Sequence, residues 1–262
     1  MTTPRVKALF FDIDGTLVSF DTHQIVPSAR EAIAALRRKG IKVFIATGRP
    51  LYLIKGLGDA LFDGYITVNG GCCIADGREI YCNAIPREEL AGLIRHEQQH
   101  GPYAYTLMTT RRVVANRATD RVAEIAAILD LPAPPVADMQ QVIEQERVLQ
   151  INLYTDECDE HAIMAAIPHC RSIRWSPRFT DIIMEGNNKQ TGIDIMLRHY
   201  GIELSETMAF GDGGNDIAML RHVATGIAMG NASDTVKQAA RYVTDTVDND
   251  GIAKALTRFG LI

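Results

Sequence analysis

The sequence predicts an α/β protein in which a doubly wound parallel sheet carries an inserted α+β unit. Three observations indicate this architecture. Short runs rich in β-branched and aromatic residues end in polar or glycine-rich turns, and helical patterns lie between them in the first and last thirds of the chain. The middle third instead shows strand-like runs in pairs, without strict alternation of strand and helix.

Five runs are predicted to form the parallel strands because they are apolar on both faces, as strands buried in a parallel sheet are. They span residues 6–11, 41–47, 65–68, 208–211 and 225–229. The turns that follow them read DIDGT, GRP, NGG, DGGND and GNAS. Ligands of such Rossmann-like folds gather at the carboxyl ends of the strands, where these polar turns fall.

A helix is predicted between the first two strands. Ser28 and Glu31 have the spacing of a capping box, Leu36 belongs to an apolar face, and Gly40 follows Lys39 as a stop signal. Strand, helix and strand form a βαβ unit, whose crossover is almost always right-handed. Later helices are predicted over residues 189–200, 215–222 and 233–240.

The inserted α+β unit is predicted to span residues 82–185, and the α/β domain residues 1–81 and 186–262. The helices expected in the insert are 87–100, 120–129 (ended by Pro132) and 160–167. The strands expected there are 103–107, 112–116, 148–155, 172–175 and 181–185. The segment LPAPPVAD fits either a linker or a loop inside this unit.

Charge and cysteine content limit the classes of function. A formal net charge of -5 disfavours nucleic acid and anionic membranes as partners, because neither would be attracted electrostatically. The five cysteines are scattered and form no C-x-x-C, so we expect reduced thiols rather than a zinc site or a disulfide framework. The first residues do not resemble a signal peptide, and no run approaches the ~18 apolar residues of a membrane helix. We therefore expect a cytoplasmic protein. The sequence does not indicate an oligomeric state, and a monomer needs no special argument.

Polar residues at the predicted strand ends point to a metal site. Side chains two apart on a strand share a face ~6.6 Å apart along it, so Asp12 and Asp14 are expected to face one centre. Asp212 would join them if its strand is a neighbour. Three acids in one cleft need a cation, and oxygen ligands without histidine or thiolate favour Mg²⁺.

Other residues at the same edge suit a phosphate group. A hydroxyl (Thr47), an ammonium (Lys189) and a carboxamide (Asn215) can all donate hydrogen bonds to phosphate oxygens. Phosphoryl transfer depends mainly on positioning and charge compensation, and a carboxylate can act as the nucleophile, which gives an aspartyl-phosphate. A metal beside Asp12 would let that carboxylate approach a phosphate dianion.

Four motifs in order resemble those of the haloacid dehalogenase-like phosphatases: DIDGT, ATGR, a lysine ahead of a helix (Lys189), and GDGGND. The insert between the second and third motifs resembles the C2B cap of the Cof-type subfamily IIB. Phrases such as FFDIDGTLVSF, FIATGRP and FGDGGNDIAMLRHVATGIAMGNA are similar to bacterial hexose-phosphate phosphatases of that group. The resemblance covers essentially the whole chain.

The resemblance implies a role for each matching residue. Asp12 would attack phosphorus, and Asp14 would protonate the leaving sugar oxygen and later activate water. Thr47, Gly48, Lys189 and Asn215 would bind the phosphate. The Mg²⁺ ligands would be Asp12, the backbone carbonyl of Asp14, Asp212, and Asp216 directly or through water. The implied partner is a small phosphorylated metabolite, most of all a hexose phosphate.

Three alternatives remain open at this stage. A phosphomutase would use the same Asp12 chemistry, but related mutases carry a helical cap after the first motif. A phosphate-accepting receiver module would lack an acid two residues after its nucleophile, whereas Asp14 stands there. The third is a phosphatase with another substrate, such as pyridoxal phosphate, a nucleotide or a flavin precursor phosphate.

Overall fold

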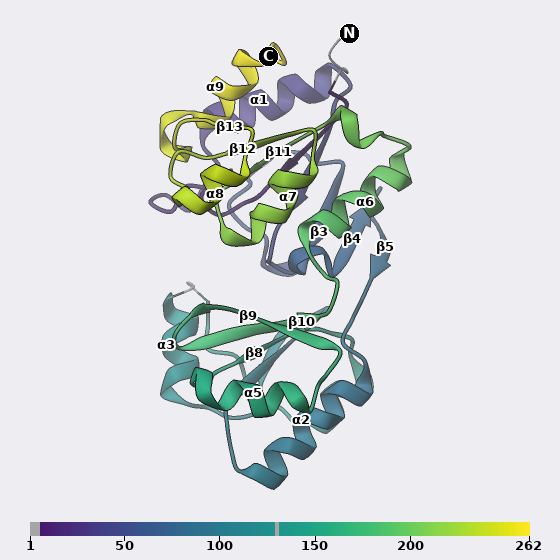
Figure 1. The fold of residues 1–262 in the computed structure, drawn as a ribbon, viewed down its shortest axis with the longest axis vertical. Helices are drawn as coiled ribbons and strands as arrows, with labels where there is room; N and C mark the ends of the chain where they lie inside the picture. The colour runs from purple at the N-terminus through teal and green to yellow at the C-terminus, as the bar shows by residue number, and fades with distance from the viewer. Residues whose placement is uncertain (1–5, 129–130) are drawn as a thin grey trace. The chain divides into compact units, whose positions relative to one another are not determined.

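The chain is described by a computed structural model over residues 6–128 and 131–262, without the side chain of Trp175. Contacts divide the chain into two compact units. The core unit comprises Met1–Cys82 and Asn188–Ile262, and the inserted unit comprises Asn83–Asn187. Both units can be followed in Figure 1.

The core unit is built on one sheet with the strand order β13-β12-β11-β1-β2-β3-β4-β5. Neighbours from β13 to β3 are parallel, and β4 and β5 form an antiparallel hairpin at one edge. The strands are β1 (Ala8–Phe11), β2 (Lys42–Ala46), β3 (Gly64–Thr67), β4 (Cys72–Ala75), β5 (Arg78–Cys82), β11 (Thr207–Gly211), β12 (Thr225–Ala228) and β13 (Tyr242–Val243). The predicted fold class is thus confirmed.

Helices cover both faces of this sheet (Figure 1). On one face, α1 (Pro27–Arg38) and α9 (Gly251–Arg258) pack on a core that includes Leu9 and Phe11. On the other face, α6 (Lys189–Tyr200), α7 (Ile217–His222) and α8 (Asp234–Ala239) pack on a core that includes Phe10. Because successive residues of β1 point to opposite faces, its ALFF run must be apolar throughout.

The strand register brings the predicted polar turns together. Phe11 at the end of β1 is paired with Phe210 of β11 on one side and with Ile45 of β2 on the other. The backbone N–H of Asp12 continues this ladder by donating to the carbonyl of Phe210 at 3.0 Å. The turns after β1, β2 and β11 therefore start at one level of one sheet edge.

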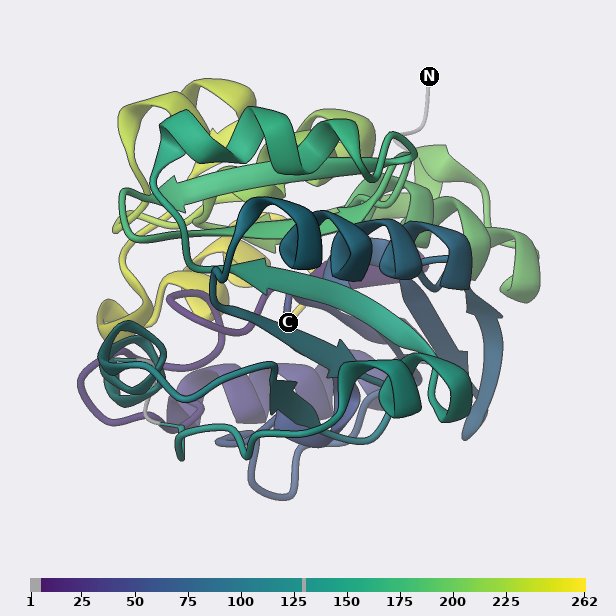
Figure 2. The same cartoon turned by 90° about the horizontal axis from the view of Figure 1, so that it is seen from below.

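The inserted unit holds an antiparallel five-stranded sheet with the order β7-β6-β8-β10-β9. Its strands are β6 (Tyr105–Thr109), β7 (Val113–Ala115), β8 (Val148–Leu153), β9 (Cys170–Ser176) and β10 (Phe179–Met184). Its helices are α2 (Arg87–His100), α3 (Asp120–Ile128), α4 (Met139–Gln145) and α5 (Glu157–Ala165). Helices of this unit run alongside its strands in both views (Figures 1 and 2). One apolar core joins α2, α4 and α5 to the sheet.

Several local predictions differ from the structure. The capping box is wrong: α1 begins one residue before Ser28, at Pro27, and no side chain caps it. Proline at this position has its φ already suited to the helix and needs no N–H partner, so the start shifts to it. The sequence reading also missed β4, β5, β13, α4 and α9, and residue Leu129, the expected end of α3, lies outside the described residues. Over residues 6–128 and 131–262, no helix combines the length and apolar character needed to cross a membrane.

Candidate active site

Three carboxylates meet at the carboxyl edge of the core sheet. Asp12 follows β1, Asp212 follows β11, and Asp216 stands at the start of α7. Oxygen atoms of the three lie within 4.8 Å of one another. Asp12 and Asp216 are buried, and Asp212 is half-buried. Such close, buried carboxylates repel each other unless cations are near.

Lys189 supplies one positive charge to this group. It begins α6 and is fully buried, and its Nζ donates to Oδ1 of Asp12 and to Oδ1 of Asp216, each at 2.5 Å. Burial alone would lower the pKa of Lys189, but the charges of Asp12 and Asp216 outweigh burial and raise that pKa above its ordinary value. The lysine is therefore a permanent cation held inside the site, whereas most lysines at helix starts are solvated.

One ammonium does not compensate all three acids. Burial raises the pKa of Asp12 from 3.8 to about 8, against the lowering effect of the Lys189 charge, with Asp216 and Asp212 raising it further. Burial likewise raises the pKa of Asp212 to about 6, while the hydrogen bond from Thr16 opposes this. Without a metal, the site thus favours a protonated Asp12 at neutral pH, and a bound cation would favour the ionised form.

Asp216 has a second role in shaping the loop after β11. Its Oδ2 accepts hydrogen bonds from the backbone N–H groups of Asp212 and Gly213, at 3.0 and 2.9 Å. A Cβ at Gly211 would lie 2.5 Å from Cγ of Asp216, so only glycine allows this approach. Both carboxylate oxygens of Asp216 are therefore engaged, one by Lys189 and one by the loop.

The carboxylate of Asp14 lies outside the group of three. It accepts hydrogen bonds from Arg49, at Oδ2 from Nε (2.8 Å) and at Oδ1 from Nη2 (2.5 Å). The expectation that Asp12 and Asp14 share a face assumed that the strand continues, but β1 ends at Phe11 and Gly15 adopts a φ of +80° in the turn. The carboxylate that joins Asp12 and Asp212 is consequently that of Asp216.

The remaining predicted phosphate-binding residues are linked by one residue that the sequence reading missed. Asn69, in the turn after β3, accepts a hydrogen bond at Oδ1 from Nδ2 of Asn215 (3.0 Å). A Cβ at Gly48 would lie 3.3 Å from the Asn69 amide. Thr47 is buried, and its Oγ1 accepts from the backbone N–H of Arg49 at 3.1 Å. Asn69 therefore lies against both the turn after β2, at Gly48, and the turn after β11, at Asn215.

Two further residues fix Asp212. Thr16 donates from Oγ1 to Oδ1 of Asp212 at 2.7 Å. Nδ2 of Asn231, in the turn after β12, donates to the carbonyl of Gly15 at 2.9 Å and lies 3.4 Å from Oδ2 of Asp212. The NGG and GNAS turns were noted in the sequence, but the asparagines in them were not predicted to reach the site.

The donor set fits Mg²⁺. It offers oxygen ligands only, from Asp12, Asp212 and Asp216, within a span that one ion can bridge. When all three are ionised, the ammonium of Lys189 leaves two negative charges, which matches a divalent cation. Asp12 and Asp212 are the better direct ligands, because Oδ1 of Asp216 is held by Lys189 and its Oδ2 by two backbone N–H groups. Oδ2 of Asp212, by contrast, has only the 3.4 Å contact with Asn231.

The sequence profile of the haloacid dehalogenase-like hydrolases matches residues 9–256, which is nearly the whole chain and includes both units. The chain belongs to this family. The resemblance inferred from the four motifs is thereby confirmed, and the matched span includes every residue of the site described above.

Similar proteins of this hydrolase family are known. The chain is 34% identical to the putative phosphatase YkrA of Bacillus subtilis over 98% of each chain. It is 44% identical to a solved structure of the subclass IIB sugar phosphatase BT4131, covering 98% of this chain and 100% of that one, with a TM-score of 0.85. It is 39% identical to the phosphatase BT1666 of Bacteroides thetaiotaomicron, covering 98% and 96%, with a TM-score of 0.91. This hydrolase is accordingly a phosphatase of the superfamily.

Gly15 gives a prediction about the geometry of this hydrolase. A Cβ at this position would lie 2.3 Å from Oδ2 of Asp212, and its φ is +80°. We expect Gly15→Ala to push the β1 and β11 turns apart and to lower kcat/KM about 100-fold, since a shift near 1 Å has effects of this order. Gly40→Ala is the matched control, because Gly40 has a φ of +74° with open space around it. Steady-state kinetics measure the effect. An equal loss of activity in both variants would contradict the close approach of Gly15 to the Asp212 carboxylate.

Proposed function

We propose that this phosphatase is a Mg²⁺-dependent phosphomonoesterase that hydrolyses sugar phosphates, most of all hexose phosphates, through an aspartyl-phosphate on Asp12. The observation that carries the proposal is the buried Asp12 carboxylate, paired with Lys189 at 2.5 Å and grouped with Asp212 and Asp216. The likeness to a subclass IIB sugar phosphatase supports the substrate class.

In the proposed first step, a carboxylate oxygen of Asp12 attacks phosphorus while the bond from phosphorus to the sugar oxygen breaks. Asp14 gives its proton to that leaving oxygen. Water then attacks the phosphorus of the aspartyl-phosphate, Asp14 takes a proton from the water, and free phosphate and the Asp12 carboxylate result. Since Arg49 donates to both oxygens of Asp14, this ion pair has to open before Asp14 can carry a proton.

Mg²⁺ would be held by the carboxylates of Asp12 and Asp212 and by the backbone carbonyl of Asp14, with Asp216 orienting the ion's surroundings. When bound, the ion supplies positive charge that offsets the repulsion between Asp12 and a phosphate dianion. The phosphoryl group would be bound by donors from two turns and a helix start, namely Thr47 and the backbone at Gly48 after β2, Asn215 after β11, and Lys189.

A phosphate-release screen tests the function. The parent protein is incubated with hexose phosphates, pentose phosphates, pyridoxal phosphate, nucleotides and a flavin precursor phosphate, each with Mg²⁺ or with a chelator. We expect free phosphate and free sugar from hexose phosphates only when Mg²⁺ is present. Turnover unaffected by the chelator would refute the metal requirement, and an isomeric sugar phosphate in place of free phosphate would show a mutase. Preference for a non-sugar substrate would refute the substrate class.

The affinity for Mg²⁺ is expected to rise with pH. The metal binds ionised carboxylates, so it must displace the protons that the metal-free site retains. With pKa values of about 8 for Asp12 and about 6 for Asp212, one proton leaves per ion between these values. The association constant should therefore rise about tenfold per pH unit from pH 6 to 8 and level off above. Calorimetric titrations in buffers of different ionisation enthalpy would measure both the affinity and the proton release. An affinity independent of pH would contradict the idea that Mg²⁺ displaces a proton from Asp12.

We also propose that the enzyme acts as a cytoplasmic monomer on a small molecule, with neither nucleic acid nor membrane as a partner. The net charge of -5 supports the exclusion of nucleic acid and anionic membranes, because polyanionic partners would be repelled.

A further inference from the structure

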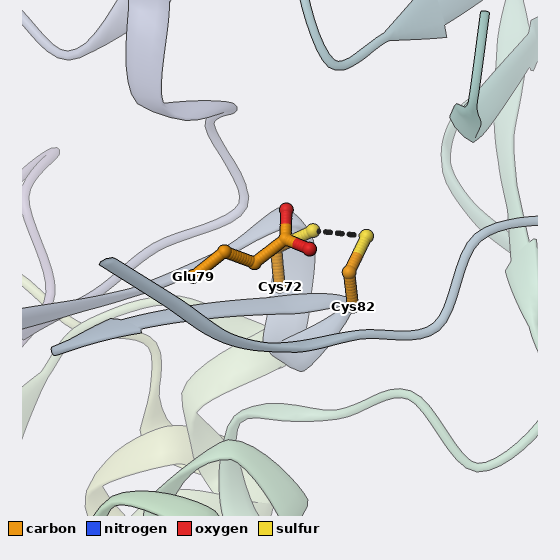
Figure 3. A group of neighbouring side chains, drawn as sticks. All are labelled: Cys72, Glu79 and Cys82. Carbon is orange, nitrogen blue, oxygen red and sulfur yellow. Dashed lines mark hydrogen bonds between the residues drawn. The ribbon is translucent and has the colours of Figure 1, made fainter.

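The hairpin of β4 and β5 brings two cysteines together at the edge of the core sheet. Cys72 begins β4 and Cys82 ends β5, and the two residues are directly opposite each other in the antiparallel ladder. The Sγ of Cys72 lies 2.7 Å from the Sγ of Cys82, as the dashed line in Figure 3 marks. The ten-residue spacing gave no signal in the sequence, because neither residue belongs to a C-x-x-C.

The positions of the two residues suit a covalent bond between them. Opposite residues of an antiparallel pair have Cα atoms about 4.5–5.5 Å apart. A disulfide accepts Cα separations of about 4.4–6.8 Å, so this bond needs no movement of the backbone. Small side-chain rotations that bring the sulfur atoms into bonding distance suffice.

The other cysteines do not compete for this reaction. Cys73 points to the opposite face of the sheet and is buried in the core beside α6, and burial raises the pKa of its thiol to about 12. Burial likewise raises the pKa of Cys170 in the inserted unit to about 12. Cys158 is exposed but lies in the inserted unit, far along the chain. Cys82 is half-buried, so it can be reached by a small oxidant, whereas Cys72 is buried.

We propose that Cys72 and Cys82 form a reversible disulfide when the protein meets a hydroperoxide. The thiolate of Cys82 attacks the peroxide oxygen, the O–O bond breaks, and an alcohol or water leaves, which yields a sulfenic acid. The thiolate of Cys72 then attacks that sulfur, the S–O bond breaks, and water leaves. The two thiols together lose two electrons and two protons, and the hydroperoxide is reduced. A small dithiol reverses the reaction by thiol–disulfide exchange.

The bond would act on the connection to the inserted unit. Cys82 is the last residue of the core unit's first segment, and Asn83 begins the inserted unit. A disulfide from Cys82 to β4 would anchor the point at which the chain leaves the core sheet. The proposal is independent of the proposed function, since it concerns thiols that the phosphatase chemistry does not use.

A metal site is the competing interpretation of the same side chains. The carboxylate of Glu79 and both sulfur atoms lie within 4.8 Å of one another (Figure 3). In a tetrahedral zinc site, however, Zn–S bonds of about 2.3 Å place two sulfur atoms about 3.8 Å apart. The observed contact of 2.7 Å is well short of that separation, and Glu79 is exposed, so the arrangement favours the disulfide.

The test uses the full chain treated with hydrogen peroxide, then denatured and labelled with a thiol-alkylating reagent. We expect labelled thiols to fall from five to three, a peptide in which Cys72 is linked to Cys82 in non-reducing mass spectrometry, and full recovery after dithiothreitol. Cys72→Ser and Cys82→Ser should each form no intramolecular link, whereas Cys158→Ser should link as the parent does.

Three outcomes would overturn the proposal. The first is irreversible oxidation of Cys82 without a link to Cys72. The second is a disulfide only between chains through Cys158. The third combines two results: no link forms after peroxide, and one Zn²⁺ per chain protects Cys72 and Cys82 from alkylation in the parent but not in Glu79→Ala. This outcome would assign Cys72, Glu79 and Cys82 to a metal site.

Discussion

Replacement of Asp12 by Asn is expected to abolish phosphate release while the fold is retained. The carboxamide is isosteric with the carboxylate but is not a nucleophile towards phosphorus, so no aspartyl-phosphate can form. We expect kcat for p-nitrophenyl phosphate to fall at least about 10⁴-fold, as loss of a catalytic nucleophile does elsewhere. Lys189 keeps Asp216 as a partner in this variant, so circular dichroism and thermal unfolding should show a folded protein.

The matched control is Asp21→Asn, an exposed acid in the loop after β1, which should keep the parent rate. A second readout separates loss of the nucleophile from loss of metal binding. After an acid quench during turnover, the parent should carry a phosphoryl group that hydroxylamine removes, and Asp12→Asn should carry none. If Asp12→Asn retains more than about 1% of the turnover or still becomes phosphorylated, Asp12 is not the nucleophile.

The buried strands and their helices could be predicted from the sequence because their patterns are determined by burial. A run such as ALFF, apolar at every position, fits only a strand covered on both faces, and the structure places it in the middle of the sheet. The β4–β5 hairpin was missed because its second strand has no buried residue and begins with the exposed Arg78 and Glu79. Its signal was the dipeptide Asp76-Gly77, which adopts the positive φ values of a tight hairpin turn, 51° and 71°.

The residues of the candidate site could be predicted better than their contacts. Strand ends identify which turns meet, but the direction of a side chain beyond the last strand residue depends on the turn itself. Gly15 redirects the chain after β1, so Asp14 is paired with Arg49 while Asp216 joins Asp12 and Asp212.

Asn69 and Asn231 show what sequence patterns leave out. Each is a single polar residue in a short turn, as surface asparagines also are, and no spacing distinguishes them. Asn69 has a φ of 50°, a conformation that asparagine tolerates better than most residues, and this places its side chain against Asn215. Only the folded arrangement shows that Asn231 bridges the turns that hold Gly15 and Asp212.

Replacement of Lys189 by Met is expected to destabilise the metal-free protein more than any surface substitution. Methionine keeps the length of the side chain but removes the ammonium, so the buried carboxylates of Asp12 and Asp216 lose their cation. Removal of one partner from a buried ion pair costs about 3–5 kcal/mol of unfolding free energy. Urea unfolding in the presence of a chelator at pH 8 measures this loss, and Mg²⁺ should restore part of it by supplying positive charge.

The loss should depend on pH in a defined direction. In the unfolded chain Asp12 ionises near its ordinary pKa of 3.8, whereas burial raises its pKa to about 8 in the folded parent, and removal of the Lys189 charge raises that value further. From pH 4 upward the folded variant therefore holds more protons than the unfolded one, so its stability falls as pH rises. At pH 5 the carboxyl of Asp12 is neutral and the difference from the parent should be smaller than at pH 8. Lys254→Met, which removes an exposed partner of Asp245, should change stability little at either pH. Equal stability of Lys189→Met and the parent at pH 8 would mean that the ammonium does not compensate the buried acids.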